Sequence, residues 1–288
     1  MEWLAGLNRA VAYLEEHLLD EEIDLDHAAR LACCSGFHFQ RMFSYIADMP
    51  LSEYLRRRKM SRAAYDLYNT TEKIIDIALK YGYDSPTAFN RAFQGIHGVA
   101  PSAAREQGVT LKAFPPISFK LTIKGEAEMN YRVETKGPIR IAGVKRHFCM
   151  SAEESFANVP LFWEETAQSG IIPRILAAMD GNPQGLLGVC AEMSGKDFDY
   201  YIAAATNKPA PEGLEEYVIP QGTWAIFDCV GPMPTALQSL QKRIVTEWLP
   251  NSGYEYANLP DIEVYFDGDQ QSENYRCEAW LPVVKSKG

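Results

Sequence analysis

The feature of this sequence that most constrains its fold is an internal repeat with an offset of fifty residues. A repeat of this period indicates that the chain builds one supersecondary unit twice. In each copy, apolar residues follow the i, i+3, i+4, i+7 spacing of a helix that buries one face. The predicted buried faces are Phe39, Met42, Phe43 and Ile46 in the first copy, and Phe89, Ala92, Phe93 and Ile96 in the second.

A shorter helix is predicted ahead of each of these helices, over residues 25–32 (LDHAARLA) and 74–81 (IIDIALKY). In the second copy, Gly82 ends one helix, Ser85 can cap the next, and Pro86 occupies its first position, where a missing N–H costs nothing. Two helices joined in this way form a helix-turn-helix motif, whose second helix can enter the major groove of DNA. The sequence therefore predicts two such motifs.

Residues 51–68 (LSEYLRRRKMSRAAYDLY) lie between the two copies and predict one continuous helix, because they contain neither Gly nor Pro. At about 1.5 Å per residue this helix would span about 27 Å, close to the ~34 Å between successive major-groove faces on one side of a duplex. A rigid spacer of this length would present both motifs to one face of DNA. Helical hairpins also serve in packing alone, so periodicity leaves that alternative open.

The formal charge of −10 argues at first against a nucleic-acid partner, but charge is unevenly distributed along the chain. Between Arg30 and Arg105 there are eleven Lys and Arg against six Asp and Glu. Residues 15–26 contain seven acidic residues and no basic one, and from residue 109 onward sixteen basic residues accompany twenty-three acidic ones. The repeat is therefore a basic block between two acidic segments.

Residues 5–106 resemble the DNA-binding domain of the AraC/XylS family of bacterial transcription regulators. The resemblance rests on IALKYGYDSPTAFNRAFQGIHGVAPSAAR, from Ile77 to Arg105, which has the family's helix, Gly-Tyr turn, recognition helix and closing G-V-x-P-x-x-x-R. YLRRRKMSRAAYDL matches the family's linker helix. The resemblance implies a double helix-turn-helix domain that reads double-stranded DNA.

The two recognition helices carry Arg41 and Arg91 at equivalent positions, and Arg to guanine is the commonest specific contact in the major groove. A surface salt bridge is the alternative for either arginine, and His38 could contact phosphate or simply lie exposed. Pro86 has no hydrogen-bond donor, which leaves the second helix less equipped to read bases. The residues that the resemblance and this reasoning assign to DNA are Phe37, His38, Gln40, Arg41, Pro86, Thr87, Asn90 and Arg91.

The spacer helix also carries a run of cations, of which Arg57 is the one we assign to DNA. Five cations within seven residues cannot share one side of a helix, so only two or three can reach phosphate, and we expect the others to be solvated. Because phosphate contacts release counterions, binding should weaken steeply with salt. The run comprises Arg56, Arg57, Arg58, Lys59 and Arg62.

The second half of the chain has a different pattern. The Pro-Pro break within residues 109–128 predicts a linker, and from Tyr131 onward the order strand, helix, strand, strand occurs twice. We therefore predict an α+β multidomain protein: an all-α double helix-turn-helix domain over 1–108, a linker over 109–128, and a pseudo-symmetric α+β domain over 129–288. A single helical region interrupted near Pro160 and Pro173 is expected over residues 152–179.

Two carboxylates on the last strands lie beside aromatic residues. Side chains two apart in a strand share a face, so Glu263 accompanies Tyr265, and Glu278 accompanies Trp280. Aromatic faces attract a cation and a partly buried carboxylate neutralises it, which predicts a site for a cationic ligand if the two strands face a common cleft. The alternative is that the two carboxylates lie on an exposed edge of the domain and form salt bridges there.

The segments QGTWAIFDCVGPM, EWLPNSGYE, DIEVYF and CEAWLPVV resemble the GyrI-like domain, a ligand-binding module built from two strand-helix-strand-strand halves. The resemblance implies a central cleft with acidic and aromatic residues, in which Glu263 and Glu278 would align with glutamates of multidrug-sensing members. Trp163 and Tyr201 are weaker candidates for lining residues, because aromatics at such spacing more often belong to the core. The AraC/XylS family usually places its DNA-binding domain last, so this order is distinctive.

Together these features predict a sequence-specific transcription regulator that senses a small amphipathic or cationic molecule. As partners we expect double-stranded DNA, a small-molecule effector and RNA polymerase. Two alternatives remain open: the second domain could dock another protein, or it could be a GyrI-like hydrolase that uses a Glu and a Tyr. No nucleophile-base pair appears at recognisable spacing, so we expect no catalytic residues.

Cofactors, metals and membranes are not expected partners. The six cysteines form no CxxC pair and no Cys/His ligand pattern, so we interpret them as reduced and mostly buried. No run approaches the roughly 18 apolar residues of a membrane helix, and the N-terminus lacks the pattern of a signal peptide. We therefore expect a cytoplasmic protein.

Overall fold

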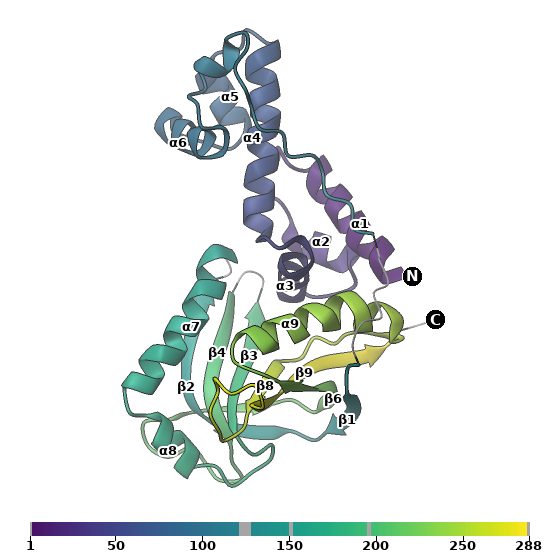
Figure 1. The fold of residues 1–288 in the computed structure, drawn as a ribbon, viewed down its shortest axis with the longest axis vertical. Coiled ribbons are helices and arrows are strands. Elements are labelled where there is room, and N and C mark those ends of the chain that lie inside the picture. The colour runs from purple at the N-terminus through teal and green to yellow at the C-terminus, as the bar shows by residue number, and fades with distance from the viewer. Residues whose placement is uncertain (1, 121–127, 150–151, 195–196, 287–288) are drawn as a thin grey trace.

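Helices alone build the first domain of the computed structural model, which describes residues 2–120, 128–149, 152–194 and 197–286 (Figure 1). The spacer helix runs nearly the full length of this domain, and the other helices gather at its two ends. The elements are α1 (Glu2–Glu16), α2 (Leu25–Leu31), α3 (Gly36–Ala47), α4 (Leu51–Asn69), α5 (Ile74–Lys80), α6 (Pro86–His97) and the 3-10 turn η1 (Ala103–Arg105).

Local capping explains where the two recognition helices begin. The Ser35 hydroxyl accepts a hydrogen bond from the backbone N–H of His38, three residues into α3. Ser85 caps α6 in the same way, with Pro86 at the first position, and Gly82 takes the left-handed φ of +80° that ends the preceding helix. Both predicted helix-turn-helix motifs are confirmed.

Each motif has its own core, and α4 connects them. Phe39 and Phe43 of α3 are fully buried against α1, α2 and the start of α4, whereas Phe89 and Phe93 of α6 pack on the far end of α4. The 19 residues of α4 correspond to a helix of about 28 Å. The predicted continuous helix between the two motifs is therefore confirmed.

The segment after η1 lies against the helical domain. The backbone N–H of Phe114 donates to the Ser61 hydroxyl. Phe119 is buried in the first core, where the Asn8 side chain accepts from its backbone N–H and donates to its carbonyl oxygen. The first part of the predicted linker therefore returns along α4 to α1 before the chain enters the second domain (Figure 1).

The second domain is an antiparallel sheet with helices, as predicted. Its described elements are β1 (Tyr131–Lys136), β2 (Ile139–Cys149), α7 (Ala152–Gln168), α8 (Ile172–Ala177), β3 (Leu186–Ser194), β4 (Asp197–Ala205), β5 (Glu215–Ile219), β6 (Gly222–Val230), α9 (Thr235–Arg243), the π-helical turn η2 (Ile244–Trp248), the 3-10 turn η3 (Leu249–Asn251), β7 (Tyr254–Tyr256), β8 (Asp261–Tyr265) and β9 (Arg276–Lys285).

The strand order shows the internal symmetry of this domain. The sheet runs β1-β6-β9-β8-β3-β4-β2-β5, and β7 pairs with β9. One half is β2-α7-β3-β4 and the other is β6-α9-β8-β9, so each half has the predicted strand-helix-strand-strand order. The halves meet where β3 pairs with β8, at the centre of the sheet.

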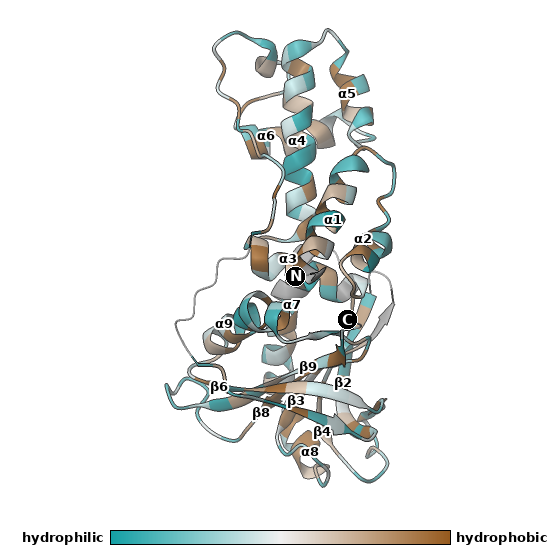
Figure 2. Ribbon diagram, turned by 90° about the vertical axis from the view of Figure 1, so that its right-hand side faces the viewer, coloured by the Kyte–Doolittle hydropathy of each residue, from teal (hydrophilic) through white to brown (hydrophobic). Residues whose placement is uncertain are grey.

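All the helices of this domain cover one face of the sheet. Phe227 and Leu281 pack beneath α9, and Phe198 and Ile202 pack beneath α7 and α8. Seen from the side in Figure 2, the sheet lies below α7 and α9, and the helical domain stands above them. Alternate residues of the same strands form a separate core on the opposite face, which includes Trp224.

One local prediction for this domain was wrong, and one strand was not predicted. Pro160 lies inside α7 and does not interrupt it, since a helix can absorb one missing hydrogen bond when its apolar face is well packed. The short strand β7 was not predicted, because its three residues are too few to show a period of two.

Candidate functional site

The second recognition helix, α6, presents its outward face to solvent. Pro86, Thr87, Asn90 and Arg91 are all exposed, and together with Gln94 they line a shallow open groove. The predicted contact residues of this motif are thus gathered on one free surface, as base reading requires.

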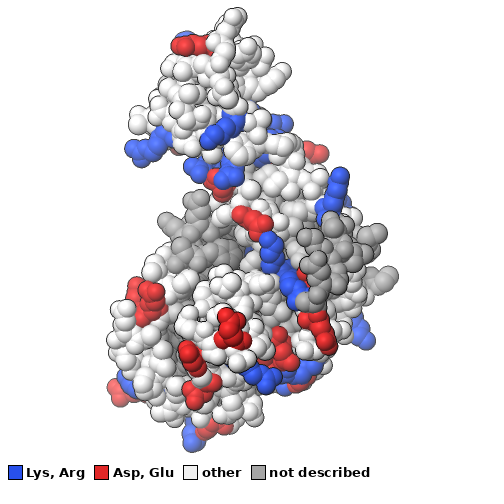
Figure 3. Space-filling model, viewed as in Figure 1, with Lys and Arg blue, Asp and Glu red and all other residues white. Residues whose placement is uncertain are grey.

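The cations of α4 are largely paired within the domain. Arg57 binds the buried Glu53 carboxylate at 2.5 Å, as does Arg56, and both guanidinium groups remain partly exposed. Arg58, in contrast, is buried in an ion pair with Glu15 at 2.7 Å. The expectation that cations without a phosphate partner are solvated is wrong for Arg58. Figure 3 shows basic side chains gathered where α6 and the middle of α4 lie.

The first recognition helix, α3, is covered by the second domain. His38 is completely buried and Gln40 is 6% exposed, so the structure contradicts the expectation that His38 lies on the surface. The Arg41 side chain is 11% exposed and lies in neither a surface salt bridge nor an open groove. Phe37 belongs to α3, but its side chain lies outside the described part of the structure.

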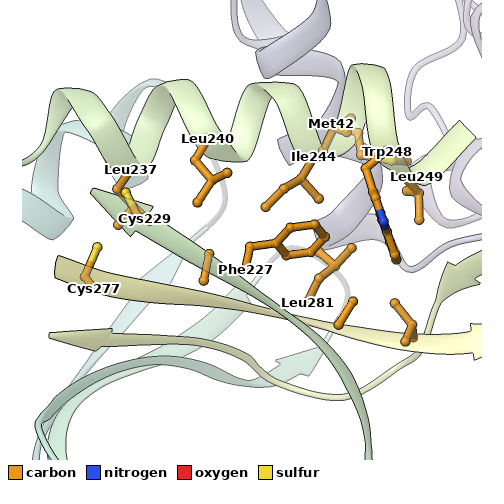
Figure 4. Packing of buried hydrophobic residues seen from close by; sticks show 14 of the residues in the cluster. Met42, Phe227, Cys229, Leu237, Leu240, Ile244, Trp248, Leu249, Cys277 and Leu281 are labelled. Carbon is orange, nitrogen blue, oxygen red and sulfur yellow. The ribbon is translucent and has the colours of Figure 1, made fainter. Parts of the chain in front are cut away.

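Apolar packing holds α3 in this place. Met42, which we predicted in the core of the helical domain, is instead buried in the core beneath α9, beside Ile244 and Trp248 (Figure 4). Tyr45 packs at the edge of the same core, and its hydroxyl donates to Gln241 of α9 at 2.5 Å. At the end of α3, Asp48 forms an ion pair with Lys242.

Beneath α3, Glu263 of β8 lies at the junction of the two halves of the sheet. Its carboxylate accepts hydrogen bonds from Tyr200 at 3.1 Å, from Tyr265 at 2.9 Å and from Gln241 at 2.8 Å. Burial, reinforced by the Glu263 carboxylate, raises the pKa of both tyrosines well above its ordinary value, so both remain donors at neutral pH. Glu263 and Tyr265 share a face, as predicted.

The same cleft contains Trp163 of α7, one of the weaker candidates. Its ring meets that of Tyr265 edge-on at 5.1 Å, and its indole N–H donates to the Tyr200 hydroxyl at 3.0 Å. On the neighbouring strand β3, the residue opposite Glu263 is Gly188. A Cβ at Gly188 would collide with the Tyr200 hydroxyl and lie 3.0 Å from the Glu263 carboxylate, so glycine makes room for this cluster.

A second carboxylate, Asp261, connects this cleft to α3. Arg41 Nη1 lies 2.9 Å from Asp261 Oδ2, His38 Nε2 lies 3.3 Å from the same atom, and Arg41 Nη2 lies 3.7 Å from Glu263 Oε1. Burial alone would raise the pKa of Asp261, but the adjacent His38 and Arg41 lower it below its ordinary value. Two carboxylates of the second domain therefore hold one arginine of the first.

The prediction that Glu263 and Glu278 face a common cleft was wrong. In the register of β8 with β9, Glu263 lies opposite Ala279, so Glu278 and Trp280 point to the other face of the sheet. There the Trp280 indole donates to Glu278 at 2.7 Å, and Arg132 forms an ion pair with Glu278 at 2.8 Å. Tyr201 also lies in the core of that face.

Sequence reasoning missed four residues of the cleft: Tyr45, Tyr200, Gln241 and Asp261. Asp261 could have been found, because it lies two residues before Glu263 on the same strand and therefore on the same face. The other three come from elements far away in the sequence, and only the tertiary fold brings them to Glu263.

Neither a metal centre nor a membrane span is found in the part of the chain that the structure describes. Its residues form no group of three or more His, Cys, Asp or Glu side chains that could hold a metal ion. None of its helices is both long and apolar enough to cross a membrane.

Comparison with known proteins gives a consistent result for both domains. Residues 129–284 match the GyrI-like small molecule binding domain, and residues 28–107 match a helix-turn-helix domain. The chain is similar to the transcriptional regulator Rob of Salmonella typhimurium, with 26% identity over 97% of this chain and 98% of that protein.

Two further similarities each cover one domain. The HTH-type transcriptional activator AarP of Providencia stuartii is 37% identical over 34% of this chain and 73% of its own length. The structure of SAV2435 bound to tetraphenylphosphonium has the same fold as the second domain, with a TM-score of 0.50 and 23% identity over 54% of this chain and 94% of that one. The chain belongs to the helix-turn-helix transcription regulators that carry a GyrI-like small molecule binding domain.

Proposed function

We propose that this regulator reads DNA with α3 and α6 and binds an amphipathic aromatic cation in the cleft around Glu263. The observation that carries the proposal is the geometry of this carboxylate, which lies at the junction of the sheet halves beside Tyr200, Tyr265 and Trp163. A carboxylate surrounded by aromatic side chains can neutralise the charge of an organic cation, and the ring faces attract the same cation.

The ligand class has further support from the arginine already in the cleft. The Arg41 guanidinium is a planar organic cation, and it lies against Asp261 and Glu263 in this structure. SAV2435 binds tetraphenylphosphonium, a permanently charged aromatic cation, and it has the fold of this domain. We therefore propose tetraphenylphosphonium as the first compound to test.

Titration calorimetry of the full chain tests this ligand class. Tetraphenylphosphonium should bind with one site per chain, and the neutral analogue triphenylphosphine oxide should bind at least tenfold more weakly, because it leaves the carboxylates uncompensated. Equal affinity for both compounds would contradict a cation site. Mass analysis of the recovered ligand would also show whether it is bound unchanged, as we propose for a regulator, or hydrolysed.

We expect Arg91→Ala to weaken binding to a specific duplex by about 1–3 kcal/mol and to relax discrimination at one base, since a bidentate arginine contact has this value. The duplex would be one selected by the wild-type chain from a random library, and affinity would be measured by fluorescence anisotropy. Lys208→Ala removes the same charge from an exposed position of the second domain and should have little effect.

An equal loss on specific and random duplexes would instead assign Arg91 to phosphate. That is the behaviour we propose for Arg57, together with a lower dependence of affinity on salt. We also propose RNA polymerase as a partner, since AarP is a transcriptional activator. As the place of action we propose the cytoplasm.

A further inference from the structure

The cleft around Glu263 is already occupied, and its occupant is part of the same chain. Arg41 contacts both carboxylates of the cleft, and the Arg41 and Asp261 side chains are 11% and 8% exposed. The cavity that remains beside Arg41, Tyr45, Gln241 and Glu263 is about 20 Å³. This is about the space of one water molecule, whereas ligand pockets usually measure about 300–1,000 Å³. An aromatic cation cannot enter until Arg41 leaves.

The same arginine cannot serve DNA and the cleft at once. Arg91, its equivalent in the second motif, is exposed on α6 and shows how a reading arginine is presented when no domain covers it. In the docked state Arg41 points between β8 and α9, and His38 stacks on Tyr256 at 4.3 Å. Base edges are therefore out of reach of α3 in this conformation.

The two copies of the motif differ where α3 meets the second domain. Met42 and Tyr45 of α3, both packed on α9, correspond to Ala92 and Gly95 of α6. A Cβ at Gly95 would meet nothing within 4 Å, so this position of α6 faces open space. Only the first copy therefore carries large side chains that fit a second partner.

Helix α3 also carries buried polar atoms that are not satisfied in this conformation. Polar side-chain atoms of Gln40 and Ser44 are buried without a hydrogen-bond partner among the described residues. A buried polar atom that loses water and gains no protein partner destabilises the conformation that buries it.

We infer that α3 is an internal plug of the cleft, in which Arg41 occupies the place of a cationic ligand, so that a cation entering the cleft releases α3 to read DNA. This inference rests on the proposed function of the cleft and of α3. Because docking excludes both the cation and DNA reading by α3, cation and DNA must strengthen each other's binding by the same factor. Docking lowers the apparent affinity for the cation and for DNA reading by α3, because only undocked chains can take part in either.

The first test measures DNA affinity without any ligand. Asp261→Asn in the full chain removes the main partner of Arg41 and should tighten binding to the selected duplex at least tenfold. Asp199→Asn is the matched control, because Asp199 has the same 8% side-chain exposure and a similar pairing, with Lys145 at 2.9 Å, but lies on the other face of the sheet. Equal affinities of the two variants would overturn the inference.

The second test measures tetraphenylphosphonium binding by calorimetry. Arg41→Ala empties the cleft and should bind this cation at least fivefold more tightly than wild type, whereas Arg91→Ala should bind it as wild type does. Saturating cation should also tighten wild-type binding to the duplex. If the wild-type chain binds both molecules but neither alters the affinity for the other, the inference is overturned and the proposed function stands. Failure of every form to bind the cation overturns both.

Discussion

Glu263→Gln is expected to abolish most binding of tetraphenylphosphonium, with a loss of about 2–5 kcal/mol, or roughly thirty-fold to several-thousand-fold in affinity. The substitution keeps the shape of the side chain and its ability to accept hydrogen bonds from Tyr200 and Tyr265, but it removes the charge that compensates a desolvated cation. Calorimetry on the full chain measures the loss directly. Binding of triphenylphosphine oxide should change much less.

The matched control for this prediction is Glu278→Gln. Glu278 is about as buried as Glu263, with side-chain exposures of 11% and 18%, and it also lies beside aromatic residues. Because it points to the opposite face and pairs with Arg132, its neutralisation should leave cation affinity unchanged. If both variants lost binding equally, the site would not be the cleft beneath α3.

The helical domain could be predicted closely from the sequence because its signals are local. The cap at Ser85, the proline at position 86 and the left-handed glycine at 82 lie within a few residues of the ends that they determine. The repeat with an offset of fifty residues also identified the inner faces of the recognition helices, except for Met42, which packs beneath α9. The ends of these helices are therefore determined mostly by residues that are close to them in the sequence.

The composition of the cleft could be predicted only in part. A period of two correctly placed Glu263 with Tyr265 and Glu278 with Trp280, but it cannot tell whether the two pairs share a face. That depends on the register between β8 and β9, and a shift by one residue would have brought both glutamates together. Register is decided by packing between distant segments, which a single strand does not reveal.

The contrast between Arg41 and Arg91 shows a further limit. Their local sequences predict the same role, yet one is buried beneath the second domain and the other is exposed. The difference was present in the sequence as Met42 and Tyr45, large side chains on the outward positions of α3. The role of these two side chains could not be predicted without the surface of α9 that they contact in the fold.

Gly143→Ala is expected to destabilise the second domain by about 3 kcal/mol or more, at or above the upper end for overpacked sites. Gly143 lies in β2, directly opposite Ala203 of β4. A Cβ at this position would overlap the Ile202 carbonyl oxygen and lie 2.5 Å from the Ala203 Cα. These atoms belong to the backbone of β4 at two buried residues, so they cannot rotate away as a side chain would, and β2 or β4 must shift.

Thermal melting would show this as a drop of about 6–12 °C in the transition of the second domain, since 1 kcal/mol corresponds to roughly 2–4 °C at this size. Gly137→Ala is the control, because a Cβ there meets nothing within 4 Å. It should be neutral or slightly stabilising, since alanine restricts the unfolded chain. An unchanged melting temperature for Gly143→Ala would mean that β2 can move away from β4 without loss, and the sheet that carries Glu263 would be less rigid than its packing indicates.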